Sequence, residues 1–320
     1  MFGWSVIGSG AIANTVAHEI VTSGRHRVVS CYSMTYSRCV KFAKQYHAKA
    51  CTSFDEAVLS DGVDGVYIAT PHTCHIEYAV RALELGVPVL IEKPIAMNSS
   101  ELGVLTNMDR AVYVSEAMWT RYNPITLKIR EIVRSGALGD IDSVHASFKY
   151  PYHLSGFSDR VVKREAGGGA LLDIGVYLVS YMDMLFGEPD TIHAESRIGK
   201  CGTDIATTMR LGYHSHGTFN ATLSVALDRL SLCSMTIRAE NGTIRMPLFY
   251  RPTHAYINIG GKQEILRCKA GYIHEFDRVA SDIRAGKMES DLITLDDSMS
   301  VMRTLDRVRS IIGLTYPCDE

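Results

Sequence analysis

The distribution of apolar residues changes its character near residue 120 of this 320-residue chain. Before that point, short runs of β-branched and other apolar residues alternate with segments in which apolar residues recur every few positions, as Ile12, Val16 and Ile20 do. The short runs predict strands and the periodic segments predict helices. The expected strands are Trp4–Ile7, Val28–Tyr32, Val63–Ala69, Val87–Ile91 and Val112–Ser115. Strands that alternate with helices favour a doubly wound parallel sheet with helices on both faces.

From residue 142 onward, long runs alternate apolar and polar residues, which is typical of antiparallel strands that bury one face. Helices are expected from about Pro124 to Gly136, Gly169 to Leu185, Tyr272 to Ala285 and Asp296 to Ile312. The pattern predicts an α/β domain of residues 1–121, then an α+β domain of residues 122–320 on a large, open, mostly antiparallel sheet. This division is also compatible with packing of the last helices against the first domain. The alternating runs occupy residues 142–150, 191–198, 206–213, 216–227 and 232–246, the last with an Asn241-Gly242 hairpin turn.

The composition is that of an ordinary globular protein, with 46% hydrophobic and 21% charged residues. Its 33 Lys and Arg against 35 Asp and Glu give a formal charge of −2, so nucleic acid and anionic membranes are not expected as partners. The first residues lack a signal-peptide pattern, and the most apolar stretch, residues 167–187, is interrupted by Asp173 and Asp183. The eight cysteines include no Cys-x-x-Cys pair, so we expect reduced core cysteines, a cytoplasmic protein and no metal site.

A glycine-rich turn joins the first expected strand to the first expected helix. Its residues match the G-x-G-x-x-A pattern of dinucleotide-binding Rossmann domains. The glycines allow a close approach to a pyrophosphate, whose charge is stabilised at the N-terminus of the helix. A tight turn without a ligand is the alternative. The expected cofactor contacts are Gly8, Ser9, Gly10, Ala11 and Ile12.

The residues after the second strand favour NADP over NAD. An NAD-binding domain usually places an acid here to bind the ribose 2′-hydroxyl, but the sequence has none between Glu19 and Asp55. Hydroxyl side chains and one arginine follow the strand instead, and these groups suit a 2′-phosphate. Arg38 as a solvated helix residue, with NAD as the cofactor, is the alternative. The expected contacts are Ser33, Met34, Thr35 and Arg38.

A lysine stands at the end of an apolar strand, in the segment Glu92-Lys93-Pro94. Ligands of open parallel sheets bind beyond the carboxyl ends of the strands, where Thr70-Pro71-His72 and His75 are also expected. Pro94 disfavours a helical conformation at Lys93 and permits a cis peptide bond, so the lysine can point into the ligand crevice. Glu92 and Lys93 are therefore candidate site residues, and a surface lysine without a role is the alternative.

A second candidate site belongs to the other predicted domain, where Gly167 to Gly169 precede a strongly apolar helix. In a helix, Asp173 and Tyr177 are four positions apart and share a face. A carboxylate among apolar neighbours requires a polar partner. The alternative is structural, with Tyr177 in the core and Asp173 as a capping or ion-pair residue.

Taken together, these motifs resemble the Gfo/Idh/MocA oxidoreductase family along nearly the whole chain. The shared elements are G-x-G-x-I-A at residues 8–13, E-K-P at residues 92–94 and G-G-G-A-L-x-D-I-G at residues 167–175. EAMWTRYNP at residues 116–124, the tyrosine of DIGVY and IIGLTYP near the end resemble its branch of dimeric dihydrodiol dehydrogenases and NADP-dependent D-xylose dehydrogenases.

The resemblance implies a nicotinamide cofactor in the first domain, a small substrate between the domains and a homodimer, or a larger assembly, through the open sheet. It assigns Lys93 and Tyr177 as catalytic residues. Many relatives have histidine in place of Tyr177, which favours the dihydrodiol and xylose branch. That branch commonly has an arginine where this chain has Met34, so the affinity for NADP depends on Arg38.

Two mechanisms are open for the oxidation of an alcohol. A free tyrosine, with a pKa of about 10, is a poor base at neutral pH, and a nearby lysine ammonium favours its phenolate. In the first mechanism Tyr177 accepts the hydroxyl proton, Lys93 supplies the charge and binds the substrate oxygen, and Asp173 orients them. In the second, Lys93 itself carries the proton. Trp119 and Arg121 are expected at the nicotinamide end or the substrate pocket, with a domain-interface position as the alternative for Trp119.

The leading functional hypothesis is an NADP-dependent dehydrogenase or reductase acting on a sugar, a cyclic diol or another polyol. The alternatives are an NAD-dependent inositol or sugar dehydrogenase, and a non-catalytic cofactor-binding sensor of the same fold. Substrate specificity is expected from the segment Lys149 to Gly169, which is rich in aromatic and charged residues. His214 and His216 alternate in an expected strand and are expected on the surface rather than at a metal site. His72 and His75 are expected beside the cofactor.

Overall fold

The computed structural model describes residues 1–152, 159–214 and 217–319. Contacts divide the chain into two compact units. The first unit comprises Met1–Trp119 and Gly271–Asp296, and the second comprises Thr120–Ala270 and Asp297–Glu320. The segment Gly271–Asp296, which the sequence division assigned to the second domain, belongs to the first unit by its contacts.

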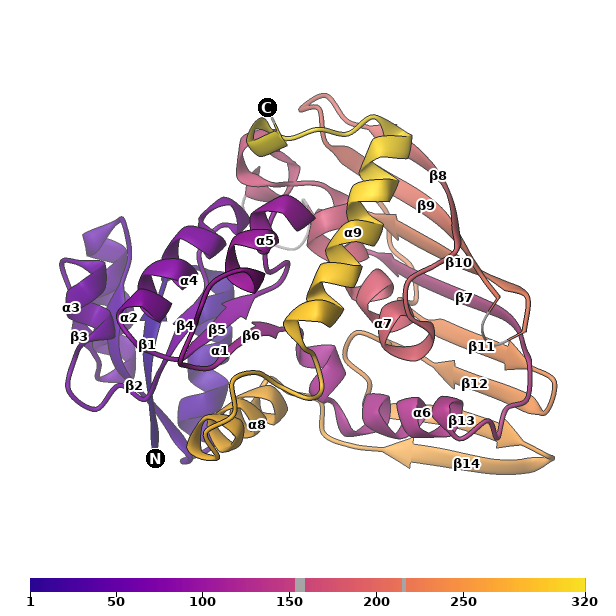
Figure 1. Ribbon diagram of the computed structural model, residues 1–320, viewed down its shortest axis with the longest axis horizontal. Helices are drawn as coiled ribbons and strands as arrows, with labels where there is room; N and C mark the ends of the chain where they lie inside the picture. Colours follow the sequence, from indigo (N-terminus) through magenta and orange to yellow (C-terminus); the bar gives the residue numbers. More distant parts are fainter. Residues whose placement is uncertain (153–158, 215–216, 320) are drawn as a thin grey trace. The chain divides into compact units, whose positions relative to one another are not determined.

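Six parallel strands form the sheet of the first unit (Figure 1). Their order is β3-β2-β1-β4-β5-β6, and the reversal between β1 and β4 confirms the predicted doubly wound sheet. β3 has two residues, which is too short for a recognisable hydrophobic pattern. The strands are β1 (Phe2–Ile7), β2 (His26–Tyr32), β3 (Lys49–Ala50), β4 (Gly65–Ile68), β5 (Val89–Glu92) and β6 (Val114–Ala117).

Six helices surround this sheet. α1 contacts α2 and α8, and α4 contacts α5. Phe276 of α8 lies in the core, with its ring centroid 4.9 Å from that of Trp4 and 5.2 Å from that of Tyr67. An ion pair of 2.8 Å between Arg25 and Asp277 holds the same helix. The helices are α1 (Ala11–Thr22), α2 (Tyr36–Tyr46), α3 (Phe54–Val58), α4 (His75–Glu84), α5 (Ser99–Thr106) and α8 (Ile273–Arg284).

Eight strands form the sheet of the second unit, in the order β14-β13-β12-β11-β7-β10-β9-β8. β7 and β10 pair in parallel and the other neighbours pair antiparallel, which confirms the predicted large and mostly antiparallel sheet. The edge hairpin of β13 and β14 was not predicted from the sequence. The strands are β7 (Ile141–Lys149), β8 (Thr191–Ile198), β9 (Asp204–Tyr213), β10 (Phe219–Ala226), β11 (Met235–Ala239), β12 (Gly242–Met246), β13 (His254–Ile259) and β14 (Lys262–Arg267).

Helices α6 (Pro124–Arg134), α7 (Val176–Phe186) and α9 (Leu295–Ile312) lie on one face of this sheet (Figure 1). We call the opposite face the outer face. Strand pairing aligns residues of all eight strands into one row across it. From β8 to β14 the row is His193, Arg210, Thr222, His145, Thr236, Arg245, Tyr256 and Ile265.

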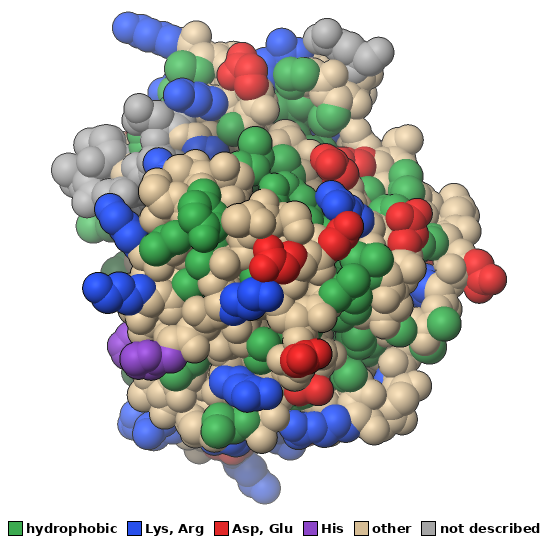
Figure 2. All heavy atoms as spheres, turned by 90° about the vertical axis from the view of Figure 1, so that its left-hand side faces the viewer, with side chains coloured by type: hydrophobic (Ala, Val, Ile, Leu, Met, Phe, Trp, Pro, Cys, Tyr) green, Lys and Arg blue, Asp and Glu red, His purple; other side chains and the backbone are tan. Residues whose placement is uncertain are grey.

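One segment of the described residues, Arg164–Phe186, is long and apolar enough to cross a membrane. Of its most apolar window, 94% is buried inside the protein, which is typical of a core helix. Figure 2 shows one face of the molecular surface, and on this face basic and acidic side chains are interspersed rather than gathered by sign.

Candidate active site

The glycine turn has the geometry that a pyrophosphate requires. Gly8 has a φ of 108°, and a Cβ there would collide with the backbone of Ala69 after β4. A Cβ at Gly10, the N-cap of α1, would point into open space. The Asn14 amide donates to the carbonyl oxygens of Ser9 and Gly10 at 3.3 and 2.9 Å. The turn therefore leaves the positive end of α1 accessible, and these residues fit a dinucleotide.

The loop after β2 lies next to this turn, because Ser9 Oγ donates to Ser33 Oγ at 3.1 Å. Thr35 is the N-cap of α2, and Arg38 is exposed in the first turn of that helix. Met34 is 83% exposed. An exposed loop of hydroxyl groups with one arginine at a helix N-terminus fits a phosphate group.

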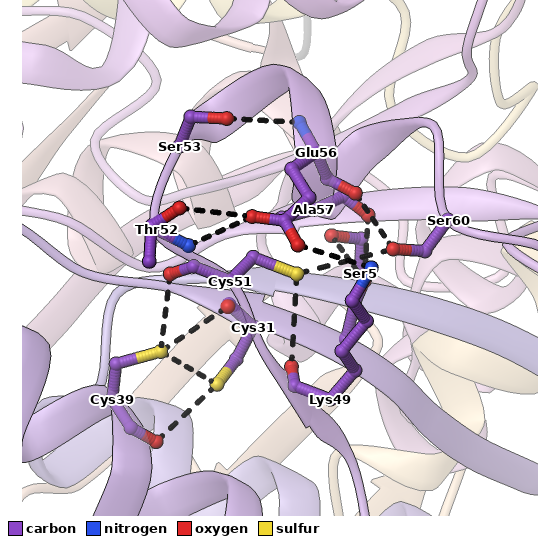
Figure 3. A network of polar contacts seen from close by, with 11 residues as sticks. Ser5, Cys31, Cys39, Lys49, Cys51, Thr52, Ser53, Glu56, Ala57 and Ser60 are labelled. Carbon is purple, nitrogen blue, oxygen red and sulfur yellow. Dashed lines mark hydrogen bonds and ion pairs between the residues drawn. The ribbon is translucent and has the colours of Figure 1, made fainter.

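Three buried cysteines, Cys31, Cys39 and Cys51, lie close together where β2, α2 and the segment after β3 meet (Figure 3). The Sγ atoms of Cys31 on β2 and Cys39 on α2 are 3.0 Å apart, and burial raises the pKa of the Cys31 thiol. Cys39 Sγ also contacts the carbonyl oxygen of Cys51, after β3. The expectation of core cysteines holds for these three and for Cys233, whereas Cys201 and Cys318 are exposed and Cys74 and Cys268 are half-buried.

His75 joins the loops that follow β4 and β5. Its ring is fully buried, with Nδ1 2.9 Å from the carbonyl oxygen of Pro94 and Nε2 3.0 Å from that of Thr70. His72 is also buried, with its ring centroid 5.7 Å from that of His75. Pro71 precedes the 3-10 turn His72–Cys74. These two hydrogen bonds of His75 are with the backbone, and a role of these residues toward the cofactor stays a prediction.

Lys93 lies at the carboxyl end of β5 and is half-buried, with a cis peptide bond to Pro94. Its backbone N–H donates to Glu92 Oε2 at 3.2 Å, and the N–H of Ile95 donates to Glu116 Oε1 at 3.1 Å. Two buried carboxyl groups therefore hold the backbone of the E-K-P loop on both sides of the lysine.

Glu92 faces the core of the first unit rather than solvent. The hydroxyl of Tyr67 donates to Glu92 Oε1, and both side chains are buried. Burial raises the pKa of Glu92 to about 7, and the Tyr67 hydrogen bond and the charge of Lys93 oppose this rise. Sequence reasoning missed Tyr67, although a tyrosine in an otherwise aliphatic buried strand signals a hydrogen-bond partner.

Trp119 and Arg121 fall on opposite sides of the boundary between the units. Trp119 stacks on Tyr272 of the first unit, with ring centroids 4.4 Å apart. The buried Arg121 guanidinium donates to Ser180 Oγ at 2.9 Å and to Asp183 Oδ2 at 2.7 Å, both on α7. The two hydrogen bonds of Arg121 hold α7, and a role of Trp119 or Arg121 toward the cofactor stays a prediction.

The three glycines of the second unit form a tightly held turn. The N–H of Gly169, at a φ of 126°, donates to the carbonyl oxygen of Val161 at 2.8 Å. The carbonyl oxygen of Gly168 accepts the Tyr316 hydroxyl at 2.6 Å. Asp204 is fully buried next to Gly169, where burial raises its pKa to about 7. The turn thus depends on Tyr316, from the IIGLTYP segment, and on Asp204.

Asp173 and Tyr177 follow this turn. The expected helix begins with a π turn, Leu171–Gly175, that carries Asp173 and continues as α7, which carries Tyr177. The Tyr150 hydroxyl donates to Asp173 Oδ2 at 3.0 Å, and Arg160 lies 3.6 Å from Asp173 Oδ1. Tyr177 is 8% exposed, with its ring centroid 5.7 Å from that of Phe148. Asp173 therefore has the polar partners that a buried carboxylate requires.

Tyr150 and Arg160 belong to the segment from Lys149 to Gly169 that is expected to determine specificity. Residues 153–158 of that segment, and His216, lie outside the described residues. Within the described part of the chain, no group of three or more His, Cys, Asp and Glu side chains is arranged to hold a metal ion.

Comparison with known proteins identifies the family. Residues 2–111 match the model of the oxidoreductase family with an NAD-binding Rossmann fold, and residues 126–245 match the GFO/IDH/MocA C-terminal domain. Trans-1,2-dihydrobenzene-1,2-diol dehydrogenase from Mus musculus is 30% identical over 335 residues, covering 99% of this chain and 98% of the relative. This chain belongs to the Gfo/Idh/MocA oxidoreductase family. The human protein of the same name is 31% identical over 338 residues, with 99% and 98% coverage.

Solved structures share the fold of this chain. The 3-ketoreductase KijD10 from Actinomadura kijaniata, in complex with NADP and TDP-benzene, aligns with a TM-score of 0.83 at 22% identity, covering 97% of this chain and 98% of that chain. The aldose-aldose oxidoreductase from Caulobacter crescentus aligns with a TM-score of 0.82 at 20% identity, covering 98% and 97%. Membership of the Gfo/Idh/MocA family makes this chain a nicotinamide-dependent oxidoreductase, which confirms the fold class and the reaction type expected from the sequence.

Proposed function

We propose that this oxidoreductase is an NADP-dependent dehydrogenase or reductase acting on a hydroxyl or carbonyl group of a sugar, a cyclic diol or another polyol. The observation that carries the proposal is the position of Lys93 at the carboxyl end of β5, in a loop that His75 joins to the loop after β4. Doubly wound sheets bind their ligands at this edge. The substrate class is supported by the relatives, which are named as diol dehydrogenases and an aldose oxidoreductase.

The first unit supplies the residues for the cofactor. Gly8, Gly10 and the first turn of α1 suit the pyrophosphate, and Ser33 and Arg38 suit a 2′-phosphate. A nicotinamide cofactor, when bound, accepts a hydride from the alcohol or returns it to the carbonyl. NADP is favoured because an acid at the ribose position would repel its phosphate, and the sequence has none between Glu19 and Asp55.

The chain's own residues handle the proton. We assign proton acceptance to Tyr177, stabilisation of its phenolate and of the substrate oxygen to Lys93, and orientation to Asp173. Asp173 is suited to a fixed position because Tyr150 and Arg160 both hold its carboxylate. Lys93 as the proton carrier is the second mechanism, and the variants described below separate the two.

The experiment that tests the function is a screen of aldoses, inositols and cyclic diols with NADP and with NAD, following the absorbance of the reduced nicotinamide. We expect turnover of at least one class, with a higher kcat/KM for NADP. A higher kcat/KM for NAD would favour the NAD-dependent dehydrogenase instead. If no substrate of the panel is turned over while the cofactor binds tightly, the protein is a cofactor-binding sensor and not an enzyme.

Two variants test the assigned residues on the best substrate. We expect Tyr177→Phe and Lys93→Met each to lower kcat by at least about a hundredfold, the scale of acid–base catalysis. The matched control for the lysine is Lys41→Met on α2, which is exposed. Near-normal turnover of Tyr177→Phe together with an inactive Lys93→Met would show that Lys93 carries the proton.

We also propose that the outer face mediates a homodimer and that the protein works in the cytoplasm. The outer face is a broad surface of polar residues such as Thr222 and Arg210, with the exposed Tyr256 and Ile265 at its β14 end. Eight cysteine thiols, none of them in a disulfide, support a reducing compartment. Sedimentation of the purified protein tests the oligomeric state.

A further inference from the structure

Tyr316 follows α9 and is held in one orientation inside the second unit. Its backbone N–H donates to Asp319 Oδ2 at 2.7 Å, and the N–H of Asp319 donates to the Tyr316 carbonyl oxygen at 3.0 Å. Asp319 also forms an ion pair with Arg309 of α9, whose guanidinium lies 4.8 Å from the centroid of the Tyr316 ring. The side chain of Tyr316 has no exposed surface. The position of its hydroxyl is therefore fixed by contacts at both the backbone and the ring.

Tyr316 and its neighbour Thr315 bind the glycine turn of residues 167–169. The Tyr316 hydroxyl donates to the carbonyl oxygen of Gly168 at 2.6 Å. Arg164, which precedes the turn, donates from Nε to the Thr315 carbonyl oxygen at 2.6 Å and from Nη2 to Thr315 Oγ1 at 3.1 Å. Three hydrogen bonds thus join the turn and the residues before it to a segment about 150 positions later in the chain.

The glycine turn in turn determines where Arg160 and Asp173 lie. A Cβ at Gly168 would be 2.7 Å from the carbonyl oxygen of Arg160, so the turn packs directly on the backbone of that residue. On the other side, the N–H of Asp173 donates to the Gly169 carbonyl oxygen at 3.1 Å. The two side chains meet, with 3.6 Å between Arg160 Nη2 and Asp173 Oδ1. A displacement of Gly168 therefore shifts both partners of this ion pair.

We propose that Tyr316 is a positioning residue for the reaction. Its hydroxyl holds Gly168, and Gly168 keeps the Asp173 carboxylate in the orientation that catalysis requires. Asp173 lies four positions before Tyr177 on the continuous π turn and α7, so a shift of the turn changes the position of the acid relative to the tyrosine. The proposal rests on the proposed function, because that function assigns orientation to Asp173.

Packing alone does not require a phenol at position 316. Phenylalanine would fill nearly the same volume, and a buried hydroxyl is destabilising unless it finds an acceptor. The turn also has other contacts, because the N–H of Gly169 donates to the Val161 carbonyl oxygen at 2.8 Å and Asp204 accepts the N–H of Leu171 at 2.8 Å. Loss of the Tyr316 hydrogen bond is therefore expected to loosen the turn rather than to unfold the second unit.

The test is Tyr316→Phe, which keeps the ring and removes the hydrogen bond to Gly168. We expect kcat on the best substrate to fall by about tenfold, because small displacements of catalytic groups are costly in rate. The Kd for NADP should match the wild type, since the expected cofactor residues around Gly8 and Arg38 belong to the first unit.

Tyr213→Phe is the matched control for this variant. Tyr213 is as buried as Tyr316 and lies in the same unit, and its hydroxyl has no hydrogen-bond partner among the residues that the structure describes. We expect Tyr213→Phe to keep the kcat of the wild type.

A double-mutant cycle with Asp173→Asn separates positioning from a general loss of stability. Single turnovers with enzyme in excess are followed, so that slow variants remain measurable. If Tyr316 acts through Asp173, Tyr316→Phe should lower the rate by about tenfold in the wild type and by less than about twofold in Asp173→Asn. An equal loss in both backgrounds would show that Tyr316 supports the fold in general, and it would overturn the proposal.

Two further measurements make the test independent of how well Tyr316→Phe folds. Arg164→Met removes the two hydrogen bonds to Thr315 and should lower kcat by about threefold, whereas the exposed Arg134→Met on α6 should not. Amide hydrogen exchange should be faster than in the wild type at residues 168–175 of Tyr316→Phe and unchanged in the first unit.

The outcomes distinguish the positioning role from the proposed function. A normal kcat of Tyr316→Phe overturns the role of Tyr316 while the dehydrogenase stands. If Tyr316→Phe does not fold, a wild-type kcat of Arg164→Met overturns that role instead. A wild type that turns over no substrate overturns the proposed function, and the catalytic role of Tyr316 with it.

Discussion

Replacement of Asp204 by asparagine is expected to remove a pH-dependent loss of stability from the second unit. Asp204 Oδ2 accepts the N–H of Leu171 at 2.8 Å and the Thr207 hydroxyl at 2.7 Å. These bonds hold the turn after Gly169, which leads into the π turn that carries Asp173. Burial raises the pKa of Asp204 from 3.8 to about 7, although the same hydrogen bonds lower it. Asparagine keeps a neutral oxygen acceptor and cannot ionise.

The sign and the size of the effect follow from proton binding. The folded protein holds the Asp204 proton up to about pH 7, whereas the unfolded chain releases it near 3.8. Below pH 3.8 this proton contributes its full share to the free energy of unfolding, and that share is lost as the pH rises through about 7. A difference of about three pH units, at about 1.36 kcal/mol each, gives about 4 kcal/mol in all. About 2.5 kcal/mol of this falls between about pH 5 and about pH 8.

Hydrogen exchange with mass spectrometry measures the second unit separately from the first. We expect the wild type to lose about 2.5 kcal/mol of protection relative to Asp204→Asn between about pH 5 and about pH 8, after correction for the intrinsic exchange rate. Any loss of stability that the amide group itself causes is the same at both pH values, so it cancels when the two pH values are compared. Asp142→Asn, an exposed acid on β7, is the control. If wild type and Asp204→Asn differ by the same amount at both pH values, Asp204 does not titrate in this range.

Three further predictions concern the cofactor, the glycine turn and the oligomer. Met34→Arg adds a second basic group beside the ribose position. It should lower the Kd for NADP by about tenfold in a fluorescence titration. An equal change in the Kd for NAD would count against a 2′-phosphate site. Gly169→Ala should lower the free energy of unfolding by about 2–3 kcal/mol, because a Cβ there meets Asp204 at a φ of 126°; an unchanged melting temperature would contradict this. Thr222→Glu should shift sedimentation from dimer to monomer, while Ser100→Glu on α5 should not; a Thr222→Glu dimer would place the interface elsewhere.

The two sheets were predictable to different extents. Five of the six parallel strands have short apolar runs with turn residues at both ends, and the sixth, β3, has only two residues. In the missed hairpin, β14 is largely exposed and β13 buries only Ala255 and Ile257, so neither strand has a strong hydrophobic pattern. The glycine pair Gly260-Gly261, both at positive φ, was the available signal for the turn. Buried strands can be predicted from their hydrophobic residues, whereas the formation of an exposed edge strand depends on pairing with a neighbouring strand.

Site residues that follow a buried strand were likewise predictable from the sequence. The glycine turn and Lys93 were predictable because each lies at the end of an apolar strand. Burial of Asp173 implied a partner but not its identity, because Tyr150 and Arg160 come from a segment outside the regular strands and helices that bear the motifs.

Helix α8 is synthesised long after the strands of the sheet that it covers. Arg25 and Asp277, which pair across the first unit, are 252 positions apart, and Phe276 completes the aromatic cluster that begins at Trp4. During translation, strands β1 to β6 leave the ribosome before the whole second sheet, and α8 follows only after that sheet. The apolar surface that α8 covers stays open until residues 273–284 have been synthesised. A stop codon before residue 273 therefore removes a helix from the unit whose sheet is built from residues 2–117.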